Sequence, residues 1–407
     1  MDRAHVVVAG GGYVGLSTAL AMKASAPGLD VVLVDAAPAD AVTRDTRASA
    51  IAAAAARMLD RLGVWERLAG GAQPITEMIV TDSRTEDPVR PVFLTFGEAG
   101  DPTAGEPFAH MVQNRDLVAA LRERAQAEGV RLVHATTVDG FRVEPTHVDV
   151  DLSDGATLRA ELLAAADGVN SKLRALAGIG TLRWSYGQKG IVATVAHEHP
   201  HEGRAFEHFL PGGPFATLPL PGNRSSLVWT EPDAVADRLV RADEFTFELE
   251  LERRFGPRFG ELTLESKPRA WPLGLTLARD FVRPRVALVG DAAHGIHPIA
   301  GQGLNLGFKD AAALAQTVVE AHRIGLDVGA LNVLENYQRW RRFDTVRMGA
   351  VTDVLNRLFS NDIAPVRLAR QFGLGLVDRM PALKRAFIEQ AAGRSATAPA
   401  LLQGRPI

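Results

Sequence analysis

Apolar and polar positions follow two different periods along the chain, and the N-terminal segment shows both. Three valines at 6–8 form a short apolar run, which a glycine-rich stretch at 10–15 and a helix-favouring stretch at 14–24 follow. A second apolar run, LDVVLV, ends just before Asp35. Unbroken apolar runs are typical of parallel strands, because such sheets are covered on both faces. The pattern therefore predicts a strand–helix–strand unit at the start of the chain.

The rest of the chain alternates between helical and strand-like texture. Alanine-rich sequence at 50–56 favours helix, whereas short runs of alternating hydrophobicity bounded by glycine or proline favour strands. The strand-like runs before residue 168 indicate a small antiparallel meander that leads to a buried strand. We expect helices at 46–68, at 114–128 and from 303 to the end, and strand-rich segments at 75–105, 138–168, 180–269 and 286–290.

The two textures interleave along the sequence, which predicts an α/β fold with a discontinuous cofactor domain. A chain of 407 residues fits two or three intertwined domains. We assign 1–75, 105–180 and 270–345 to a Rossmann-like domain, 76–104 and 181–269 to an inserted β-rich substrate domain, and 346–407 to a C-terminal helical region.

Composition narrows the classes of function. The net charge of −3 gives no electrostatic support for nucleic-acid binding. The absence of cysteine excludes disulfides, iron–sulfur clusters and cysteine nucleophiles, and it permits a reducing compartment. No apolar run is long enough to cross a bilayer, and the N-terminal apolar stretch is too short for a signal peptide. We therefore expect a soluble, cytoplasmic protein.

The glycine-rich stretch at 10–15 fits the dinucleotide-binding pattern G-x-G-x-x-G. Gly10 permits the turn, Gly12 lets a pyrophosphate approach the backbone, and Gly15 lets the helix pack on the strand. The following helix would offer free N–H groups and its positive end to the phosphates. Asp35, at the end of the second strand, could accept hydrogen bonds from ribose hydroxyls. This fingerprint leaves open whether the ligand is FAD or a nicotinamide dinucleotide.

Two later motifs bear on that choice. Asp167-Gly168 ends the apolar run AAA, and Gly290-Asp291 ends the apolar run VALV. Either pair alone is equally consistent with a strand-terminal turn, because Asp and Gly are common turn residues. The second pair opens GDAAHGIHPIAGQGLNLG, whose density of glycine costs backbone entropy and so suggests contact between main chain and ligand.

In this order the three motifs resemble those of the single-component, class A FAD-dependent aromatic hydroxylases, which share the para-hydroxybenzoate hydroxylase fold. The resemblance covers nearly the whole chain. It is most specific toward the ubiquinone-biosynthesis hydroxylases of the 2-polyprenyl-6-methoxyphenol hydroxylase type. Four stretches carry it: RASAIAAAAARMLDRLGVW, AHEHPHEGRAFEHF, FATLPLPGNRSSLVW and HPIAGQGLNLGFKDAAALA. One departure is Asp35, where the family more often has glutamate.

The resemblance implies a GR2-type FAD-binding fold and a set of cofactor-binding residues. Asp291 would hold the FAD ribose, Asp167 would serve the pyrophosphate and transient nicotinamide binding, and Arg47 would lie along the FAD. A helix that starts near Gly303 would aim its N–H groups at the anionic reduced flavin, and Pro298 would lie near the ring edge. The full set is Gly10, Gly12, Tyr13, Val14, Gly15, Asp35, Arg47, Gln113, Arg115, Val138, Asp167, Gly168, Gly290, Asp291, Pro298, Gly301, Gly303, Leu304 and Asn305.

The resemblance also implies an activity. NAD(P)H would reduce FAD, O2 would add to form a flavin C4a-hydroperoxide, and a polyprenylated phenol would be hydroxylated on its ring in ubiquinone biosynthesis. Because the flavin carries this chemistry, we name no catalytic acid or base. Contact with the inner membrane face, with a quinone-synthesis complex or within a homodimer is compatible with this reading. The alternatives are a hydroxylase of a soluble aromatic, a flavin-free dehydrogenase and a non-catalytic flavin-bearing subunit.

Two groups of histidines attract attention. His197, His199 and His201 alternate as zinc ligands on a strand would, but Pro200 and Gly203 favour a solvated strand-end loop, so we expect no metal site. The histidines at 294 and 297 are expected to bond locally within their turn. Apolar residues of the β-rich segment are expected mostly to form sheet core, with some lining a pocket for a lipid-like tail.

Overall fold

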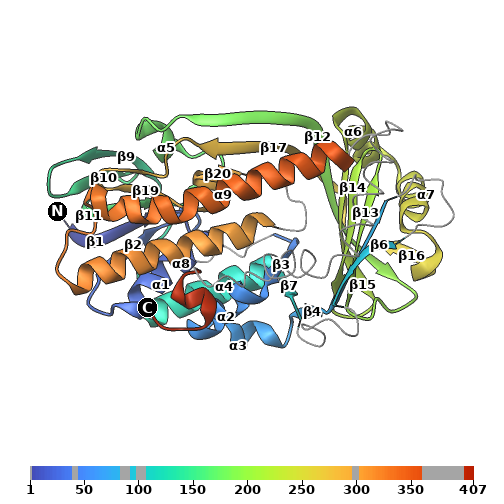
Figure 1. The fold of residues 1–407 in the computed structure, drawn as a ribbon, viewed down its shortest axis with the longest axis horizontal. Coiled ribbons are helices and arrows are strands. Elements are labelled where there is room, and N and C mark those ends of the chain that lie inside the picture. Colours follow the sequence, from blue (N-terminus) through green and yellow to red (C-terminus); the bar gives the residue numbers. More distant parts are fainter. Residues whose placement is uncertain (1, 39–44, 83–91, 98–106, 296–301, 360–397) are drawn as a thin grey trace.

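Two large sheets and one small sheet organise the described part of the chain (Figure 1). The computed structural model describes residues 2–38, 45–82, 92–97, 107–295, 302–359 and 398–407. Pro298 and Gly301, two of the predicted cofactor-binding residues, lie outside the described residues, as does much of the predicted C-terminal helical region. The mixed helix and strand content confirms the predicted α/β class.

The first sheet contains the predicted strand–helix–strand unit and the meander. Its path is β18 (Val282–Arg283), β19 (Val286–Leu288), β11 (Thr157–Ala165), β1 (Asp2–Ala9), β2 (Val31–Val34) and β8 (Arg131–Val133). Off this path, β10 (Val148–Leu152) pairs with β11, and β9 (Val138–Val143) pairs with β10. The run from β19 to β8 is parallel. The helices associated with it are α1 (Tyr13–Ser25), α4 (Asn114–Ala127), α5 (Lys172–Leu176), α8 (Gln302–Arg323) and α9 (Leu331–Phe359).

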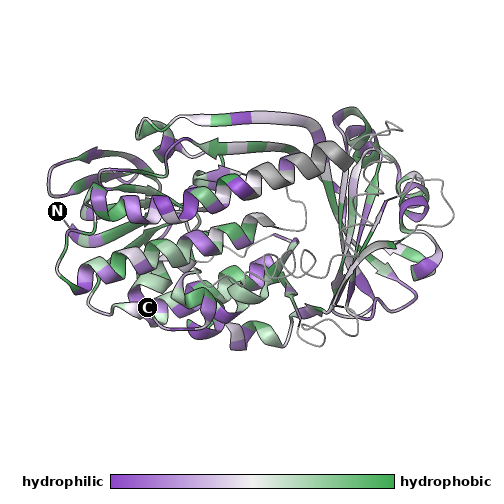
Figure 2. Cartoon of the chain, in the orientation of Figure 1, coloured by the Kyte–Doolittle hydropathy of each residue, from purple (hydrophilic) through white to green (hydrophobic). Residues whose placement is uncertain are grey.

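Helix packing explains why the strands of this sheet are continuously apolar. The valines at 6–8 and those at 31, 32 and 34 are almost fully buried in one core that also includes residues of α1, α4 and α8. Helices α8 and α9 carry both hydrophobic and hydrophilic stretches (Figure 2), as expected for helices that cover a core on one side.

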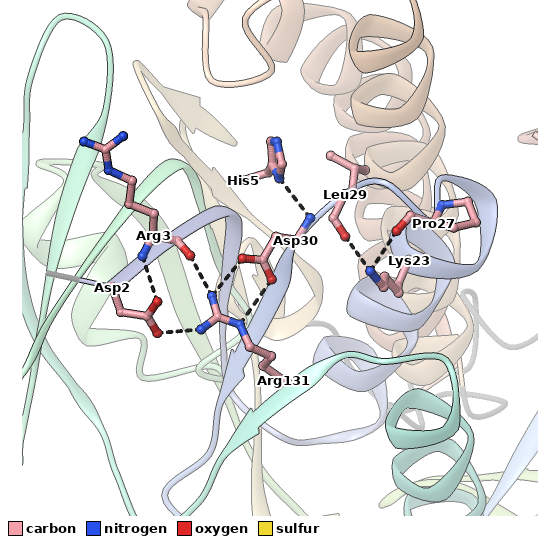
Figure 3. Close-up of polar contacts among 8 residues, drawn as sticks. All are labelled: Asp2, Arg3, His5, Lys23, Pro27, Leu29, Asp30 and Arg131. Atoms are coloured by element: carbon pink, nitrogen blue, oxygen red, sulfur yellow. Dashed lines mark hydrogen bonds and ion pairs between the residues drawn. The ribbon is translucent and has the colours of Figure 1, made fainter.

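Ion pairs fasten the amino-terminal ends of three parallel strands. The Arg131 guanidinium, at the start of β8, bonds the carboxylates of Asp2 and Asp30, which lie at the starts of β1 and β2 (Figure 3). The backbone N–H of Asp30 donates to Nδ1 of His5, and Lys23 donates to two carbonyls of the loop between α1 and β2. The glycine turn and Asp35 lie at the opposite, carboxyl end of these strands, where open α/β sheets bind ligands.

The second sheet lies between the site and two helices. It contains β5 (Glu77–Asp82), β6 (Val92–Phe96), β12 (Thr181–His197), β13 (Arg204–Leu210), β14 (Gly213–Leu220), β15 (Arg224–Pro232), β16 (Leu262–Leu264), β17 (Arg269–Ala278) and β20 (His294–Gly295). Helices α6 (Asp233–Arg241) and α7 (Glu244–Phe255), with the turn η1 (Pro257–Phe259), lie on its outer side (Figure 1). Phe215 and Trp229 of the sheet pack with Phe247 of α7 in a second core.

These two helices were not anticipated within the segment 180–269, which was predicted as strand-rich. Asp243 starts α7 by accepting a hydrogen bond from the backbone N–H of Thr246, a local signal that is visible in the sequence. The long strands β12 and β17 of the second sheet pair with each other over most of their length. They extend from the main part of this sheet to a position beside the first sheet (Figure 1). Strand β17 belongs to this sheet, although nearly all of it falls within 270–345, the range predicted for the cofactor domain. The predicted domain limits stay a prediction.

The predicted helix at 46–68 is wrong at its start. Residues Ala48–Ala52 form β3, which pairs with β7 (Ala109–Gln113), and β7 also pairs with β4 (Gln73–Ile75). Helices α2 (Ala53–Arg61) and α3 (Trp65–Ala69) follow β3. Tertiary pairing with β7 overrides the helix propensity of the alanines, which is worth only a fraction of a kcal/mol per residue.

The end of the chain returns to the first sheet's helices. The turn η4 (Ala400–Gln403) contacts α2 and α8, and Leu401 and Leu402 are buried in the main core. The carbonyl of Leu402 accepts a hydrogen bond from Arg57 on α2. Among the described residues, no helix is both long and apolar enough to cross a membrane.

Candidate functional site

A cavity of about 600 Å³ lies where the second sheet meets the glycine turn and the start of α8. One side is formed by strands β12, β14, β15 and β17, and the other by residues of α1, β3, η2 (Gly290–Ala292) and α8. Five of the predicted cofactor-binding residues line it: Tyr13, Arg47, Asp291, Gly303 and Leu304. The structure therefore brings together residues that are nearly 300 positions apart in the chain.

The glycines of the turn differ in the space around them: two are packed against backbone, and one has free space beside it. A Cβ on Gly10, whose φ is +117°, would lie 2.3 Å from the carbonyl oxygen of Ala166, and a Cβ on Gly15 would lie 1.9 Å from that of Gly10. A Cβ on Gly12 would meet nothing within 4 Å. Helix α1 starts there without a side-chain cap and without an acidic residue in its first turn. The turn thus presents open space beside uncapped N–H groups, which suits a phosphate.

Asp35 lies directly against this turn. A Cβ on Gly11 would fall 2.1 Å from Oδ2 of Asp35. The carboxylate accepts a hydrogen bond from the backbone N–H of Ala37, and Nη2 of Arg122 lies 3.4 Å from Oδ2. The shorter side chain of aspartate therefore still places a carboxylate beside the dinucleotide turn.

Asp167 and Gly168 lie in the turn that precedes α5. The Asp167 carboxylate accepts hydrogen bonds from Oγ of Ser171 at 2.5 Å and from the backbone N–H of Leu173 at 3.1 Å, so it holds the helix start. Gly168 has a φ of +83°, and a Cβ on it would meet nothing within 4 Å. The next two residues, Val169 and Asn170, line the cavity, whereas Asp167 does not.

A buried charge network supports Gly290 and Asp291. Asp310 on α8 accepts hydrogen bonds from the backbone N–H of Gly290 at 3.0 Å, from Nε2 of His294 at 2.5 Å and from Nε of Arg341 at 2.7 Å. Burial alone would raise the pKa of Asp310, but His294 and Arg341 outweigh burial and lower that pKa. The expectation that His294 bonds within its own turn is wrong, because its partner is on α8. His297 lies outside the described residues.

Asp291 itself faces the cavity from η2. Burial, followed by the nearby charge of Asp310, raises the pKa of its carboxyl above the ordinary value. The helix that carries Asp310 also approaches α1, since a Cβ on Gly307 would lie 2.5 Å from Cγ2 of Val14. A Cβ on Gly290 would likewise lie 3.0 Å from Cγ1 of Val14. Val14 thus packs the two glycine motifs against each other.

Residues at the start of α8 have two different roles: some line the cavity, and one holds β3. A Cβ on Gly303 would meet no atom of the described residues within 4 Å, and both Gly303 and Leu304 line the cavity. The amide of Asn305 instead bonds the backbone of β3, with Oδ1 accepting from the N–H of Ala52 and Nδ2 donating to the carbonyl of Ala50, both at 2.8 Å. A cofactor contact by Asn305 therefore rests on its backbone.

The predicted residues 113–115 are divided between two cavities. Gln113 and Arg115 line a smaller cavity of about 250 Å³, whereas Asn114 lines the main cavity. Asn114 accepts a hydrogen bond from Ser49 and donates one to Asp45.

Arg47 and Val138 complete the predicted set. Arg47 bonds Asp45, and its guanidinium carbon lies 5.6 Å from the ring centroid of Trp271, which also lines the main cavity. Val138 is packed in the main core and is not among the residues that line the cavity.

The histidine-rich segment at 197–201 has a structural explanation. His197 bonds the carbonyl of His199 through Nδ1 and Oγ of Ser225 through Nε2. His201 bonds the carbonyl of Leu220 and the N–H of Gly203. In the parts of the chain that the structure describes, no three His, Cys, Asp or Glu side chains gather as metal ligands would.

One residue of the cavity wall was missed as a functional candidate. Glu207 on β13 is 5% exposed, and burial raises the pKa of its carboxyl to about 7. The available signal was a carboxylate within the mostly apolar run AFEHFL, where a strand buried on both faces would ordinarily carry none.

The residues present fit an FAD. Glycines 12 and 303 leave open space at two points of the site, α1 starts uncapped, and carboxylates are available at Asp35 and Asp291. This donor set matches the needs of a dinucleotide: N–H groups for phosphates and carboxylates for hydroxyls. The neighbouring apolar sheet offers room for a second, less polar molecule.

Comparisons with known proteins agree with this chemistry. Residues 3–342 match the family model described as FAD binding domain. The chain is 45% identical to the ubiquinone hydroxylase UbiL of Rhodospirillum rubrum, over 99% of this chain and 94% of that protein. It is 34% identical to the 3-demethoxyubiquinol 3-hydroxylase of Escherichia coli, over 96% and 98% of the two chains.

A solved structure has the same fold. The p-nitrophenol 4-monooxygenase PnpA of Pseudomonas putida superposes with a TM-score of 0.78 at 21% identity, over 97% of this chain and 100% of that one. The GR2-type flavoprotein fold is thereby confirmed. The chain therefore belongs to the FAD-binding domain family and, within it, to the FAD-dependent aromatic hydroxylases that include enzymes of ubiquinone biosynthesis.

Proposed function

We propose that this flavin-dependent monooxygenase hydroxylates the ring of a polyprenylated phenol in ubiquinone biosynthesis. The observation that carries the proposal is the lining of the main cavity, which joins predicted cofactor-binding residues such as Tyr13 and Asp291 to apolar residues of the second sheet. Similarity to a ubiquinone hydroxylase and to a 3-demethoxyubiquinol 3-hydroxylase over nearly the whole chain supports the same substrate class.

The residues of the first sheet would hold FAD. Gly12 and the uncapped start of α1 would receive the phosphates, Asp35 would accept from one ribose, and Asp291 would bond hydroxyls nearer the flavin. Gly303 leaves room for the flavin beside the start of α8. Bound FAD, once reduced by NAD(P)H as transient co-substrate, supplies the activated oxygen.

The second sheet would hold the phenol. Ala216, Leu218 and Val228 turn apolar side chains to the cavity, and Val192 extends this wall across β12. An apolar wall excludes water from the reacting centre and suits an aromatic ring with a hydrocarbon tail. Arg47 and Asp291 line the flavin side of the cavity, and the second sheet adds polar groups that include Glu207.

A polyprenylated substrate partitions into lipid. We therefore place the enzyme in the cytoplasm with peripheral contact to the inner membrane face, to a quinone-synthesis assembly or to a second copy of the chain. Membrane contact of this kind needs only a surface patch, because a hydrocarbon tail can be taken up from the bilayer surface.

Deleting the gene and identifying the compound that accumulates tests the substrate. A polyprenylated phenol that lacks one ring hydroxyl is the expected product of the block, and complementation by the wild-type chain should remove it. Normal ubiquinone levels in the deletion strain would contradict the proposal and favour a soluble aromatic substrate.

Complementation with a variant of the flavin site distinguishes an enzyme from a non-catalytic subunit that carries a flavin. The Asp291→Ala variant removes a carboxylate of the flavin site, so we expect it to restore no quinone synthesis although the folded chain is present. Full complementation by this variant, with FAD no longer bound, would indicate a structural subunit.

A further inference from the structure

The second sheet carries one carboxyl group in an otherwise apolar row that faces the cavity. Glu207 on β13 pairs with Ala216 on β14, Ala216 pairs with Val228 on β15, and Val228 pairs with Val192 on β12. All four residues line the main cavity. Because directly paired residues of neighbouring strands face the same side of a sheet, the carboxyl projects with these small apolar side chains.

A buried carboxylate on the opposite face of the same sheet has hydrogen-bond partners. Glu231 on β15 is also buried, but it bonds the guanidinium of Arg254 at 3.0 Å and Nε1 of Trp229 at 2.8 Å. Oε2 of Glu207 has no hydrogen-bond partner among the described residues. A buried polar atom without a partner costs about 1 to 3 kcal/mol, and such atoms are rare. A ligand in the cavity could therefore donate a hydrogen bond to this oxygen of Glu207.

No described cation is placed to satisfy this carboxyl. Besides Glu207, the charged residues that line the main cavity are Arg47, Arg183 and Asp291, and Asp353 on α9 lies beside the cavity residue Trp184. Arg183 bonds Thr276, Asp353 bonds Trp184 and Arg47 bonds Asp45. Burial raises the pKa of Glu207, and no charge among the described residues offsets this effect.

We propose that the carboxylate of Glu207 accepts the hydroxyl hydrogen of the phenol substrate, first as a hydrogen bond and then as a proton. This inference rests on the proposed function, because it needs a phenol in the cavity. The O–H bond of the phenol breaks, its electron pair stays on the ring oxygen, and a new O–H bond forms on Glu207. The ring thereby becomes a stronger electron donor toward the activated oxygen.

The proton returns when the ring regains aromaticity. The hydrogen on the newly hydroxylated carbon leaves to solvent as a proton, and Glu207 gives its proton back to the ring oxygen. Glu207 ends the cycle as a carboxylate and is ready for the next substrate. A group with a pKa of about 7 suits this exchange, because proton acceptors work best when their pKa lies near the working pH.

The test uses the FAD-loaded full chain with 2-prenylphenol as probe. Hydroxylated product and NADH consumption are measured from pH 5.5 to 9 for wild type, Glu207→Gln and Glu207→Asp. The control is Glu77→Gln, which removes a carboxylate paired with Arg204 between β5 and β13 and outside the cavity lining. Thermal melting and flavin absorbance report whether each variant folds and binds FAD.

We expect wild-type product formation to rise with pH through about 7, because protonated Glu207 cannot accept a proton. Glu207→Gln should lose this rise and form product about 100-fold more slowly, the usual worth of a positioned base, while NADH oxidation continues. Glu207→Asp should recover part of the rate, and Glu77→Gln should match wild type. A ring-fluorinated probe, whose hydroxyl loses its proton more readily, should narrow the gap between wild type and Glu207→Gln.

Two outcomes would overturn the inference in different ways. A Glu207→Gln variant that hydroxylates the probe with wild-type pH dependence, or that changes only KM, would remove Glu207 as proton acceptor and leave the proposed function standing. A wild-type enzyme that binds and reduces FAD yet hydroxylates no phenol at any pH would defeat the proposed function, and the role of Glu207 with it.

Discussion

Asn305 and Ala52 are 253 positions apart, and the side-chain oxygen of Asn305 accepts the backbone N–H of Ala52 at 2.8 Å. The amide nitrogen of the same side chain donates to the carbonyl of Ala50. Asn305 thus acts as one more strand partner for β3, from the first turn of α8. Residues of both elements line the main cavity, so this pair of hydrogen bonds sets the distance between two of its walls.

Replacing Asn305 by alanine should lower the free energy of unfolding by about 2 to 4 kcal/mol, because two buried backbone groups lose their partners. FAD affinity should fall with it, since β3 and α8 would no longer be held together. Asn332→Ala, at an exposed position on α9, is the matched control. Thermal melting with a titration of FAD measures both effects, and an unchanged melting temperature would contradict this role of Asn305.

Two glycines of the same turn should fail in different ways when each is replaced by alanine. A Cβ at position 15 would collide with the carbonyl of Gly10, so Gly15→Ala should unfold or strongly destabilise the chain even without FAD. A Cβ at position 12 meets only open space, so Gly12→Ala should leave the apoprotein stable and weaken FAD binding at least tenfold. Melting curves of the two apoproteins, with FAD titrations, distinguish them. Equal FAD affinity in Gly12→Ala and wild type would show that no phosphate lies there.

The buried network around Asp310 predicts a large cost for losing its cation. Arg341 is 3% exposed and bonds an Asp310 that is fully buried, so Arg341→Met should destabilise the fold by about 3 to 5 kcal/mol. Arg342 is its exposed neighbour in the chain, and Arg342→Met should change stability by less than about 0.5 kcal/mol. Chemical denaturation of both variants checks the difference. Similar losses in the two would mean that Asp310 finds another partner.

Glu207 should make stability fall as pH rises. Burial raises its pKa in the folded chain from 4.5 to about 7, so the folded state holds the proton more tightly than the unfolded state. The stabilising contribution is complete below pH 4.5 and is lost as pH rises through 7, a change of about 3 kcal/mol. Glu207→Gln cannot lose a proton, so its stability should exceed that of wild type by more at pH 8 than at pH 5. Parallel curves for the two proteins across this range would place the carboxyl in a more polar environment.

Local sequence predicted most of the first sheet correctly, because its signals are short-range. The valine runs of β1 and β2, the glycine turn and the helix over 114–128 are each recognisable within a single element. Within the alanine-rich stretch at 50–56, residues 50–52 were misassigned to helix because the intrinsic helix preference of alanine is small, whereas residues 53–56 are helical as predicted. In β3, strand pairing with β7 and hydrogen bonds to Asn305 override this helix preference, and both partners are distant in the sequence.

The sequence by itself determined the class of ligand and the family, because glycine spacing and strand-end carboxylates are local patterns. Only the tertiary structure decided what each predicted side chain does. Asn305 turned out to hold β3, Asp167 to hold the start of α5, and His294 to bond Asp310. The same is true of Glu207, whose surroundings are not evident from the residues next to it in the chain. Its unusual state arises from burial, and burial depends on the strands and helices that the fold packs around a residue rather than on its neighbours in the chain.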